Sequence, residues 1–200
     1  PWPLELSRFM APLATTLTAI AALSEFLHHQ LRILGIRLRR PQAVVFGLGR
    51  KGLQLVRDLR AEGNRVVVIE HDANNEYFEL CRELGAVALV GDAAQVDVLR
   101  RARADSADQV FASCGDDGVN VDVAVHVYEL YRARRVKQRP RLECRLHIVD
   151  PMLCEALKLH GMFRDPGSEF VVSVSNIYES SARLVLEEDP LDREFIGAAD

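Results

Sequence analysis

From residue 41 onward, short apolar runs alternate with stretches in which apolar residues recur at every third or fourth position. The runs are apolar at nearly every position, which is typical of strands that are buried on both faces of a parallel sheet. About six strands are predicted on this ground, at Gln42–Phe46, Arg65–Ile69, Val87–Val90, Gln109–Ala112, Leu142–Val149 and Phe170–Val174.

The intervening stretches have the spacing of one helix face. Gly63 and Gly85 follow two of them, and glycine commonly ends a helix in a left-handed conformation. Helices are accordingly predicted at Leu53–Ala61, Glu76–Leu84, Asp97–Arg103, Val119–Arg132 and Met152–Leu159. Because strands and helices alternate with connections of a few residues, we expect residues 41–176 to form an α/β domain with helices on both faces of a parallel sheet.

Residues 1–40 differ and are predicted to form an N-terminal apolar helix with a basic linker. The segment Phe9–Leu27 is almost wholly apolar, and a basic cluster follows it at Arg32, Arg37, Arg39 and Arg40. The positive-inside rule describes this order for a membrane segment that ends in the cytoplasm, although a spanning helix needs about 20 apolar residues and this one includes Ser24 and Glu25. A helix that packs on a neighbouring subunit or domain is the alternative. The chain starts at Pro1 without a methionine, so we expect a longer protein, which favours the membrane segment.

Composition excludes several classes of protein. The chain has 200 residues, 48% of them apolar and 27% charged, which excludes a disordered tail or a fibre. The net charge of −4 gives no reason to expect a nucleic-acid partner. The cysteines lack metal-binding spacing, so free thiols in a reducing compartment are expected; they are Cys81, Cys114, Cys144 and Cys154.

A glycine motif lies between the first predicted strand and the first predicted helix, and it reads Gly47-Leu48-Gly49-Arg50-Lys51-Gly52. In a dinucleotide-binding turn the first glycine permits the tight turn, the second lets a pyrophosphate approach the backbone, and the third lets the helix pack on the sheet. The helix N-terminus offers N–H groups to phosphates, and Arg50 and Lys51 add two cations. The motif therefore predicts a phosphate-binding loop in a Rossmann-type doubly wound sheet. A glycine turn without a ligand is the alternative.

Glu70 supplies the second half of this fingerprint. It ends the second predicted strand, 18 residues after Gly52, where a carboxylate can accept hydrogen bonds from ribose hydroxyls. A carboxylate here would repel a 2′-phosphate, so NAD or another adenine nucleotide is favoured over NADP. On this interpretation the only role of Glu70 is ribose binding.

The stretch from Ala43 to about Val174 resembles the N-terminal lobe of RCK/KTN domains of the TrkA-N type. Four segments carry the resemblance in order: the glycine motif, Val66–Asp72, Val90–Ala93 and Ser113–Asn120. The last is similar to the family's T-G-D-D-x-x-N, from which Ser113-Cys114 departs. The resemblance implies a nucleotide cleft formed by Gly47, Leu48, Gly49, Arg50, Lys51, Gly52, Glu70, His71, Asp92, Ala93, Ser113, Gly115, Asp116 and Asn120.

The resemblance also implies a function. Domains of this family are non-enzymatic nucleotide sensors that control potassium channels and transporters from the cytoplasmic face of the cell membrane. NAD(H) is the expected ligand, with ATP, ADP or AMP as further candidates. An NAD-dependent oxidoreductase fragment without its substrate domain is the alternative. The Tyr-x-x-x-Lys pattern of short-chain reductases is absent, since Tyr128 precedes Arg132 and Tyr178 precedes Ala182 at that spacing.

Residues 177–200 are predicted to form a crossover helix and a polar tail. The helix, at Ile177–Glu188, resembles the one through which RCK lobes pair, with Ile177, Leu184 and Val185 on its apolar side. A homodimer or larger homo-oligomer is expected, together with the membrane portion of a channel or transporter. A helix that merely closes the same domain is the alternative.

Three remaining features have plainer interpretations. The basic stretch from Arg132 to Arg141 is expected to be a solvated helix end and loop, or else a contact with acidic lipid or a partner. His71, His147 and His160 are each expected to be structural or solvated. One acid of Asp116-Asp117 is expected to cap the following helix, and a cation site there is the alternative.

Overall fold

The computed structural model describes residue 10 and residues 12–20, 23–24, 40–134, 141–159 and 169–176. The chain divides into two compact units, residues 1–39 and residues 40–200. Residues 177–188, His160 and most of the basic stretch lie outside the described residues.

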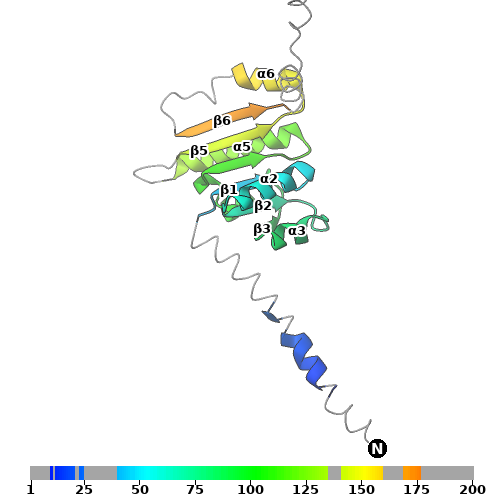
Figure 1. Ribbon diagram of the computed structural model, residues 1–200. Helices are drawn as coiled ribbons and strands as arrows, with labels where there is room; N and C mark the ends of the chain where they lie inside the picture. The colour runs from blue at the N-terminus through cyan, green and yellow to red at the C-terminus, as the bar shows by residue number, and fades with distance from the viewer. Residues whose placement is uncertain are drawn as a thin grey trace, which may run out of the picture. The chain divides into compact units, whose positions relative to one another are not determined.

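The second unit contains a six-stranded parallel sheet of order β3-β2-β1-β4-β5-β6 (Figure 1). The strands are β1 (Ala43–Phe46), β2 (Val66–Glu70), β3 (Val87–Val90), β4 (Gln109–Ala112), β5 (Leu142–His147) and β6 (Phe170–Ser175). The predicted Rossmann-type doubly wound sheet is therefore confirmed. The chain builds outward from β1 in one direction and then in the other, so the direction of winding reverses between β1 and β4. Open α/β sheets bind ligands at the carboxyl ends of the strands at such a point.

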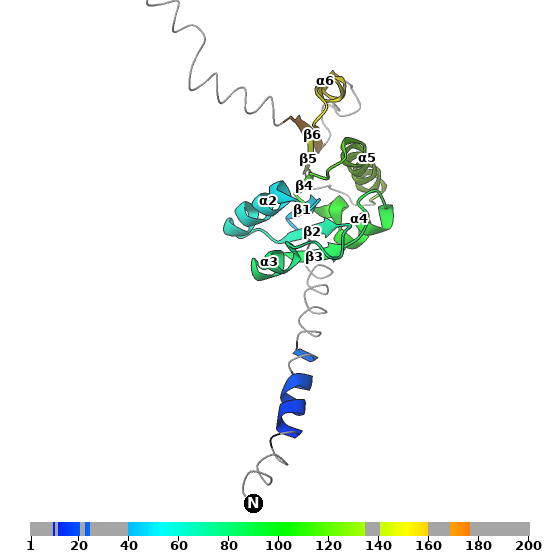
Figure 2. The ribbon, with the colours of Figure 1, turned by 90° about the vertical axis from the view of Figure 1, so that its right-hand side faces the viewer.

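Helices cover both faces of this sheet, with α2 and α3 on one side and α4 and α5 on the other (Figure 2). They are α2 (Arg50–Ala61), α3 (Phe78–Glu83), α4 (Val96–Ala102), the 3-10 helix η1 (Ala104–Ser106), α5 (Asp117–Ala133) and α6 (Pro151–Leu159). Gly63 and Gly85 have φ of 81° and 78°, so both glycines end their helices in the predicted left-handed conformation.

The core is aliphatic, because the central strands are buried on both faces. All four residues of β1 and all five of β2 are buried. On one face Leu53, Val56 and Leu59 of α2 pack with Phe78 of α3 against the sheet. The spacing of these three α2 residues is the apolar face that the sequence predicts.

Element ends differ from prediction where side chains bind the backbone. The fifth strand ends at His147 and not at Val149. The reason is that the N–H groups of Val149 and Asp150 donate to the carboxylate of Asp117, at 2.8–2.9 Å, which directs the chain away from the sheet. Helix α3 begins two residues later than predicted, because the side chain of Asn75 accepts from the N–H of Tyr77 in a preceding turn.

In the first unit, residues 12–20 are helical. The hydroxyls of Thr16 and Thr18 donate to backbone carbonyls one turn earlier, at 2.9–3.1 Å. Within the described part of the chain, no helix is both long and apolar enough to cross a membrane. The predicted segment Phe9–Leu27 extends beyond the described residues at both ends.

Candidate functional site

A cleft of about 930 Å³ lies at the carboxyl ends of the strands, between the loops that follow β1, β2, β3, β4 and β5. Most of the residues expected from the sequence meet in it. Those that line the cleft are Gly47, Leu48, Gly49, Arg50, Lys51, Glu70, His71, Asp92, Ala93, Ser113, Gly115 and Asp116. Gly52 and Asn120 lie outside its lining.

The glycine loop has the geometry that close approach of a ligand requires. Gly47 has φ of +90°, and a Cβ there would lie 2.7 Å from the carbonyl oxygen of Ser113. A Cβ on Gly52 would lie 2.0 Å from the carbonyl oxygen of Gly47, so Gly52 serves packing and not the cleft. A Cβ on Gly49 would meet nothing within 4 Å. The space over Gly49 is therefore open to a ligand.

The N-terminus of α2 faces this open space. Gly49 is its N-cap and has no side chain with which to cap the N–H groups of the first turn. Such uncapped donors, together with the helix dipole, favour an anion. Arg50 and Lys51, the first two residues of α2, also line the cleft, so this region suits phosphate groups.

Glu70 connects the end of β2 to the glycine loop. Its side chain is buried, with an exposed fraction of 7%. Its Oε2 accepts from the N–H of Leu48 at 2.7 Å and its Oε1 from that of Asp72 at 3.1 Å. Nδ1 of His71 lies 2.9 Å from Oε1. A carboxylate has about four acceptor positions, so Glu70 can hold the loop and still accept from a ligand hydroxyl.

Asn120 positions two loops from beneath the cleft. It is fully buried in α5, its Oδ1 accepts from the N–H of Cys114 at 2.8 Å, and its Nδ2 donates to the carbonyls of Cys114 and His147 at 3.1 and 2.9 Å. Asn120 therefore fixes the ends of β4 and β5 relative to each other. The side chain of Asn120 thus shapes these loops, and its expected contact with a nucleotide stays a prediction.

Polar side chains shape the remaining loops. Oγ of Ser113 donates to the carbonyl of Phe46 at 3.0 Å, joining the ends of β4 and β1. Asp92 accepts from the N–H of Ala94 at 2.9 Å, which forms a turn after β3. Asp116 is the N-cap of α5 and accepts from the N–H of Val119 at 3.0 Å, so the predicted acidic cap is confirmed.

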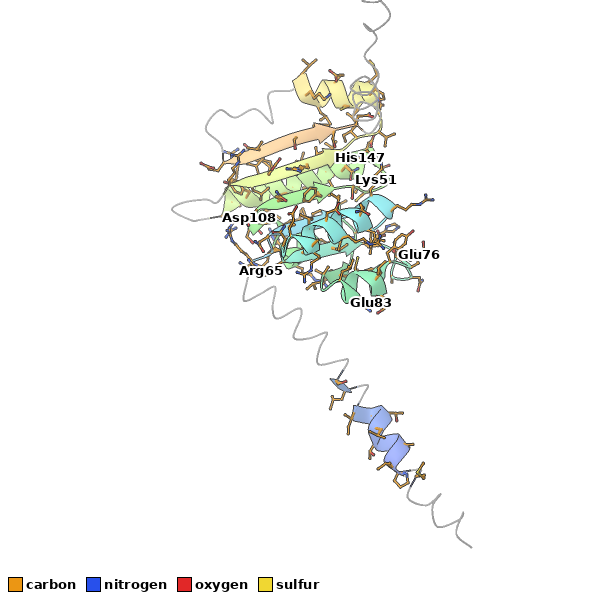
Figure 3. All side chains as sticks on the ribbon, in the orientation of Figure 1. Lys51, Arg65, Glu76, Glu83, Asp108 and His147 are labelled. Atoms are coloured by element: carbon orange, nitrogen blue, oxygen red, sulfur yellow. The ribbon has the colours of Figure 1, made fainter. Side chains whose placement is uncertain are left out.

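His147 is a cleft residue that the sequence did not indicate. It is the last residue of β5 and lines the cleft, in the position at the strand end that Glu70 has in β2. Its Nε2 lies 2.6 Å from Nζ of Lys51, and Figure 3 shows the two side chains next to each other. Burial lowers the pKa of His147, the charge of Lys51 lowers it further, and Asp117 opposes both. The predicted strand extends two residues too far, to Val149. Had its end been placed at His147, the position of this residue at the carboxyl end of a strand would have indicated the cleft.

Cys114 also lines the cleft. Burial raises the pKa of its thiol to about 11, and nearby carboxylates, Glu70 first, raise it further. The thiol is therefore protonated near neutral pH, unlike a nucleophilic or metal-binding thiolate. Within the described ranges, no group of three or more His, Cys, Asp or Glu side chains could hold a metal ion.

A model of the TrkA-N domain family matches residues 43–149, the range from β1 to just beyond β5. The chain belongs to the TrkA-N domain family. The match contains all five loops of the cleft and every residue of the predicted nucleotide set, so the resemblance seen in the four sequence segments is confirmed.

Solved structures support the fold of this TrkA-N domain. The NAD(P)-binding domain of an exopolyphosphatase-related protein from Archaeoglobus fulgidus is 17% identical with a TM-score of 0.56, and the match covers 74% of this chain and 97% of that one. The TrkA-N domain of the inner membrane protein YbaL from Escherichia coli is 21% identical with a TM-score of 0.53, over 74% and 96% of the two chains.

The GsuK channel, in a structure bound to NAD, is 21% identical with a TM-score of 0.47, and the match covers 60% of this chain. The chain spans about a fifth of the GsuK chain, since 20% of that chain is covered.

Proposed function

We propose that this TrkA-N domain is a nucleotide-sensing module that binds NAD(H) or another adenine nucleotide and thereby controls potassium or other cation transport by a membrane channel or transporter. Its site would be a binding site and not a catalytic one. The domain would act at the cytoplasmic face of the cell membrane.

The observation that carries this proposal is the position of Glu70 beside the open glycine loop. Its carboxylate accepts a hydrogen bond from the backbone N–H of Leu48. The same cleft contains the open face of Gly49 and the N-terminus of α2. A ribose can therefore bind at Glu70 while its attached phosphates lie over Gly49. The loop of Asp92 and Ala93 borders the same end and would contact the adenosine half.

The charge at Glu70 gives the ligand preference. A ribose 2′-phosphate would place two negative charges next to the buried Glu70 carboxylate, whereas a ribose hydroxyl would donate a hydrogen bond to it. We therefore propose that NAD(H), ATP, ADP and AMP bind in preference to NADPH.

Control of transport would work as a population shift. The ends of β1, β4 and β5 are linked through hydrogen bonds of Ser113 and Asn120, so the loops that follow these strands would move together. A ligand that contacts several of these loops would bind one arrangement of them better than another. The difference in affinity between two arrangements is the free energy available to bias a gate. Pairing through the predicted helix at Ile177–Glu188 would transmit that bias between subunits.

Isothermal titration of the full chain with NAD, NADH, ATP, ADP, AMP and NADPH tests the proposal. We expect binding of at least one adenine nucleotide well below millimolar concentration, with NADPH weaker than NADH. Absence of binding for all six ligands, or strongest binding of NADPH, would overturn it. Sustained oxidation of NADH by the chain in the presence of carbonyl compounds would instead support an oxidoreductase.

A further inference from the structure

The end of the cleft at β5 places a histidine against a lysine of the glycine loop. Nζ of Lys51 lies 2.6 Å from Nε2 of His147, and the two residues are 96 positions apart in the chain. A lysine ammonium can only donate hydrogen bonds. Nε2 of His147 is therefore the acceptor, and its imidazole is neutral with the ring proton on Nδ1.

Burial and the neighbouring charges together favour the neutral form of His147. Lys51 faces it from α2 and Asp117 faces it from α5, and burial together with Lys51 outweighs Asp117 and lowers its pKa. On β5 itself, Arg145 is already paired with Glu143 at 2.9 Å. The other titratable groups that line the cleft are Arg50, Glu70, His71, Asp92, Cys114 and Asp116. A negative charge placed between Lys51 and His147 would favour the imidazolium.

We propose, on the basis of the nucleotide site proposed above, that Lys51 and His147 form an anion subsite for a phosphate group of the ligand, and that His147 takes up one proton when this phosphate binds. A phosphate oxygen would accept from Nζ of Lys51 and from Nε2–H of His147 in place of the bond that now joins them. The proton comes from solvent. Lys51 is the second residue of α2, so this subsite continues the anion-binding region of the helix N-terminus.

The two ends of the cleft thus suit different parts of a ligand. Glu70 and Asp92, at the ends of β2 and β3, suit hydroxyl groups that donate hydrogen bonds. Lys51 of α2 and His147 at the end of β5 lie on the other side of the cleft and suit ligand oxygen atoms that accept hydrogen bonds. The ligand class is accordingly an adenine nucleotide with a diphosphate, whose second phosphate reaches the subsite.

Titration of the full chain with ADP-ribose and with adenosine, between about pH 8 and about pH 6, tests the proposal. Each phosphate of ADP-ribose has one ester bond, the shared anhydride bond and a single strongly acidic oxygen, so the charge of this probe is constant over that range. We expect ADP-ribose to bind about fivefold tighter at the lower pH, since a shift of one pKa unit on binding corresponds to at most tenfold in affinity. The binding heat should depend on the ionisation enthalpy of the buffer in the direction of proton uptake.

Two variants locate the effect. His147→Gln keeps an acceptor for Lys51 but cannot be protonated, so it should bind ADP-ribose with no rise at the lower pH. Lys51→Gln should weaken ADP-ribose binding at both pH values and leave adenosine binding unchanged. Adenosine controls for His71, because that histidine lies beside Glu70 at the ribose end.

The outcomes separate this proposal from the nucleotide site on which it rests. A rise in affinity of equal size in the parent and in His147→Gln overturns the subsite, and so does a parent whose affinity for ADP-ribose is independent of pH. In both cases the nucleotide site itself stands. If neither adenosine nor ADP-ribose binds, the proposed function fails together with the subsite. Circular dichroism of each variant shows that loss of binding is not loss of fold.

Discussion

The backbone N–H of Leu48 donates to Oε2 of Glu70 at 2.7 Å. This bond joins the glycine loop after β1 to the last residue of β2 across a separation of 22 residues. The expectation from sequence that Glu70 serves only a ribose is therefore incomplete. The same carboxylate sets the position of the loop that would hold the phosphates, so the proposed ligand binding would be coupled to loop geometry through one side chain.

Removal of the Glu70 carboxylate should thus have two effects. Glu70→Ala should weaken binding of an adenine nucleotide by about tenfold or more, because hydrogen bonds to a charged group contribute about 1.5–3 kcal/mol. It should also lower the melting temperature of the empty protein, since the N–H of Leu48 loses its acceptor at a cost of about 1–3 kcal/mol. Titration calorimetry and thermal denaturation measure the two effects.

The matched control for this prediction is Glu129→Ala, which removes an exposed carboxylate of α5 outside the cleft. Neither affinity nor melting temperature should change in it. An unchanged melting temperature in Glu70→Ala would show that the bond to Leu48 contributes nothing to stability, and unchanged affinity would remove Glu70 from the ligand site.

Two glycines of the same motif should respond differently to alanine. Gly52→Ala places a Cβ 2.0 Å from the carbonyl oxygen of Gly47 and should lower the free energy of unfolding by about 1–3 kcal/mol, as overpacking does. Gly49→Ala meets no atom within 4 Å, so its loss of stability should be smaller, limited to the about 1 kcal/mol by which alanine is a poorer N-cap than glycine. It should still bind nucleotide more weakly, because its methyl group occupies the ligand's space. Each variant is the control for the other. Equal stability of the two variants would contradict this geometry.

The thiol of Cys114 should react slowly near neutral pH. Its pKa is raised to about 11 by burial and nearby carboxylates, and only the thiolate is nucleophilic. The rate of alkylation by iodoacetamide should therefore rise about tenfold per pH unit from about pH 7 to about pH 10, and a bound nucleotide should slow it. Cys114→Ser identifies the reacting thiol by mass spectrometry. A rate that levels off near pH 8 would indicate an ordinary exposed thiol.

We expect assembly of the protein to depend on residues at the two ends of this sequence. We expect the full chain to form a dimer or larger oligomer through Ile177, Leu184 and Val185. These apolar residues would be buried by pairing with a second copy, and two-fold dimers are the commonest homo-oligomers. We also expect it to require detergent or lipid through the segment Phe9–Leu27. Light scattering with and without detergent measures both. A monodisperse monomer without detergent would contradict both expectations at once.

The order and type of the six strands and of the α-helices described between residues 41 and 176 follow from the sequence alone, whereas the 3-10 helix at Ala104–Ser106 was not predicted. Val87–Val90 and Gln109–Ala112 occur as predicted, because an uninterrupted apolar run can bury both its faces only inside a covered sheet. The roles of Gly47 and Gly52 are equally local, since a tight turn and close helix packing each require the absence of a side chain within a few residues. These features determine the tight glycine loop between β1 and α2 and the close packing of that helix on the sheet.

The tertiary structure alone decided which side chains meet around that loop. The bond between Leu48 and Glu70, the clamp of Asn120 on the ends of β4 and β5, and the pair of Lys51 and His147 all join segments whose proximity depends on the strand order. Local periodicity reports which face of an element is buried, but it carries no information about which strand lies beside which. The partners of a side chain at the end of a strand are set by that order, so they could be read only once the sheet was assembled.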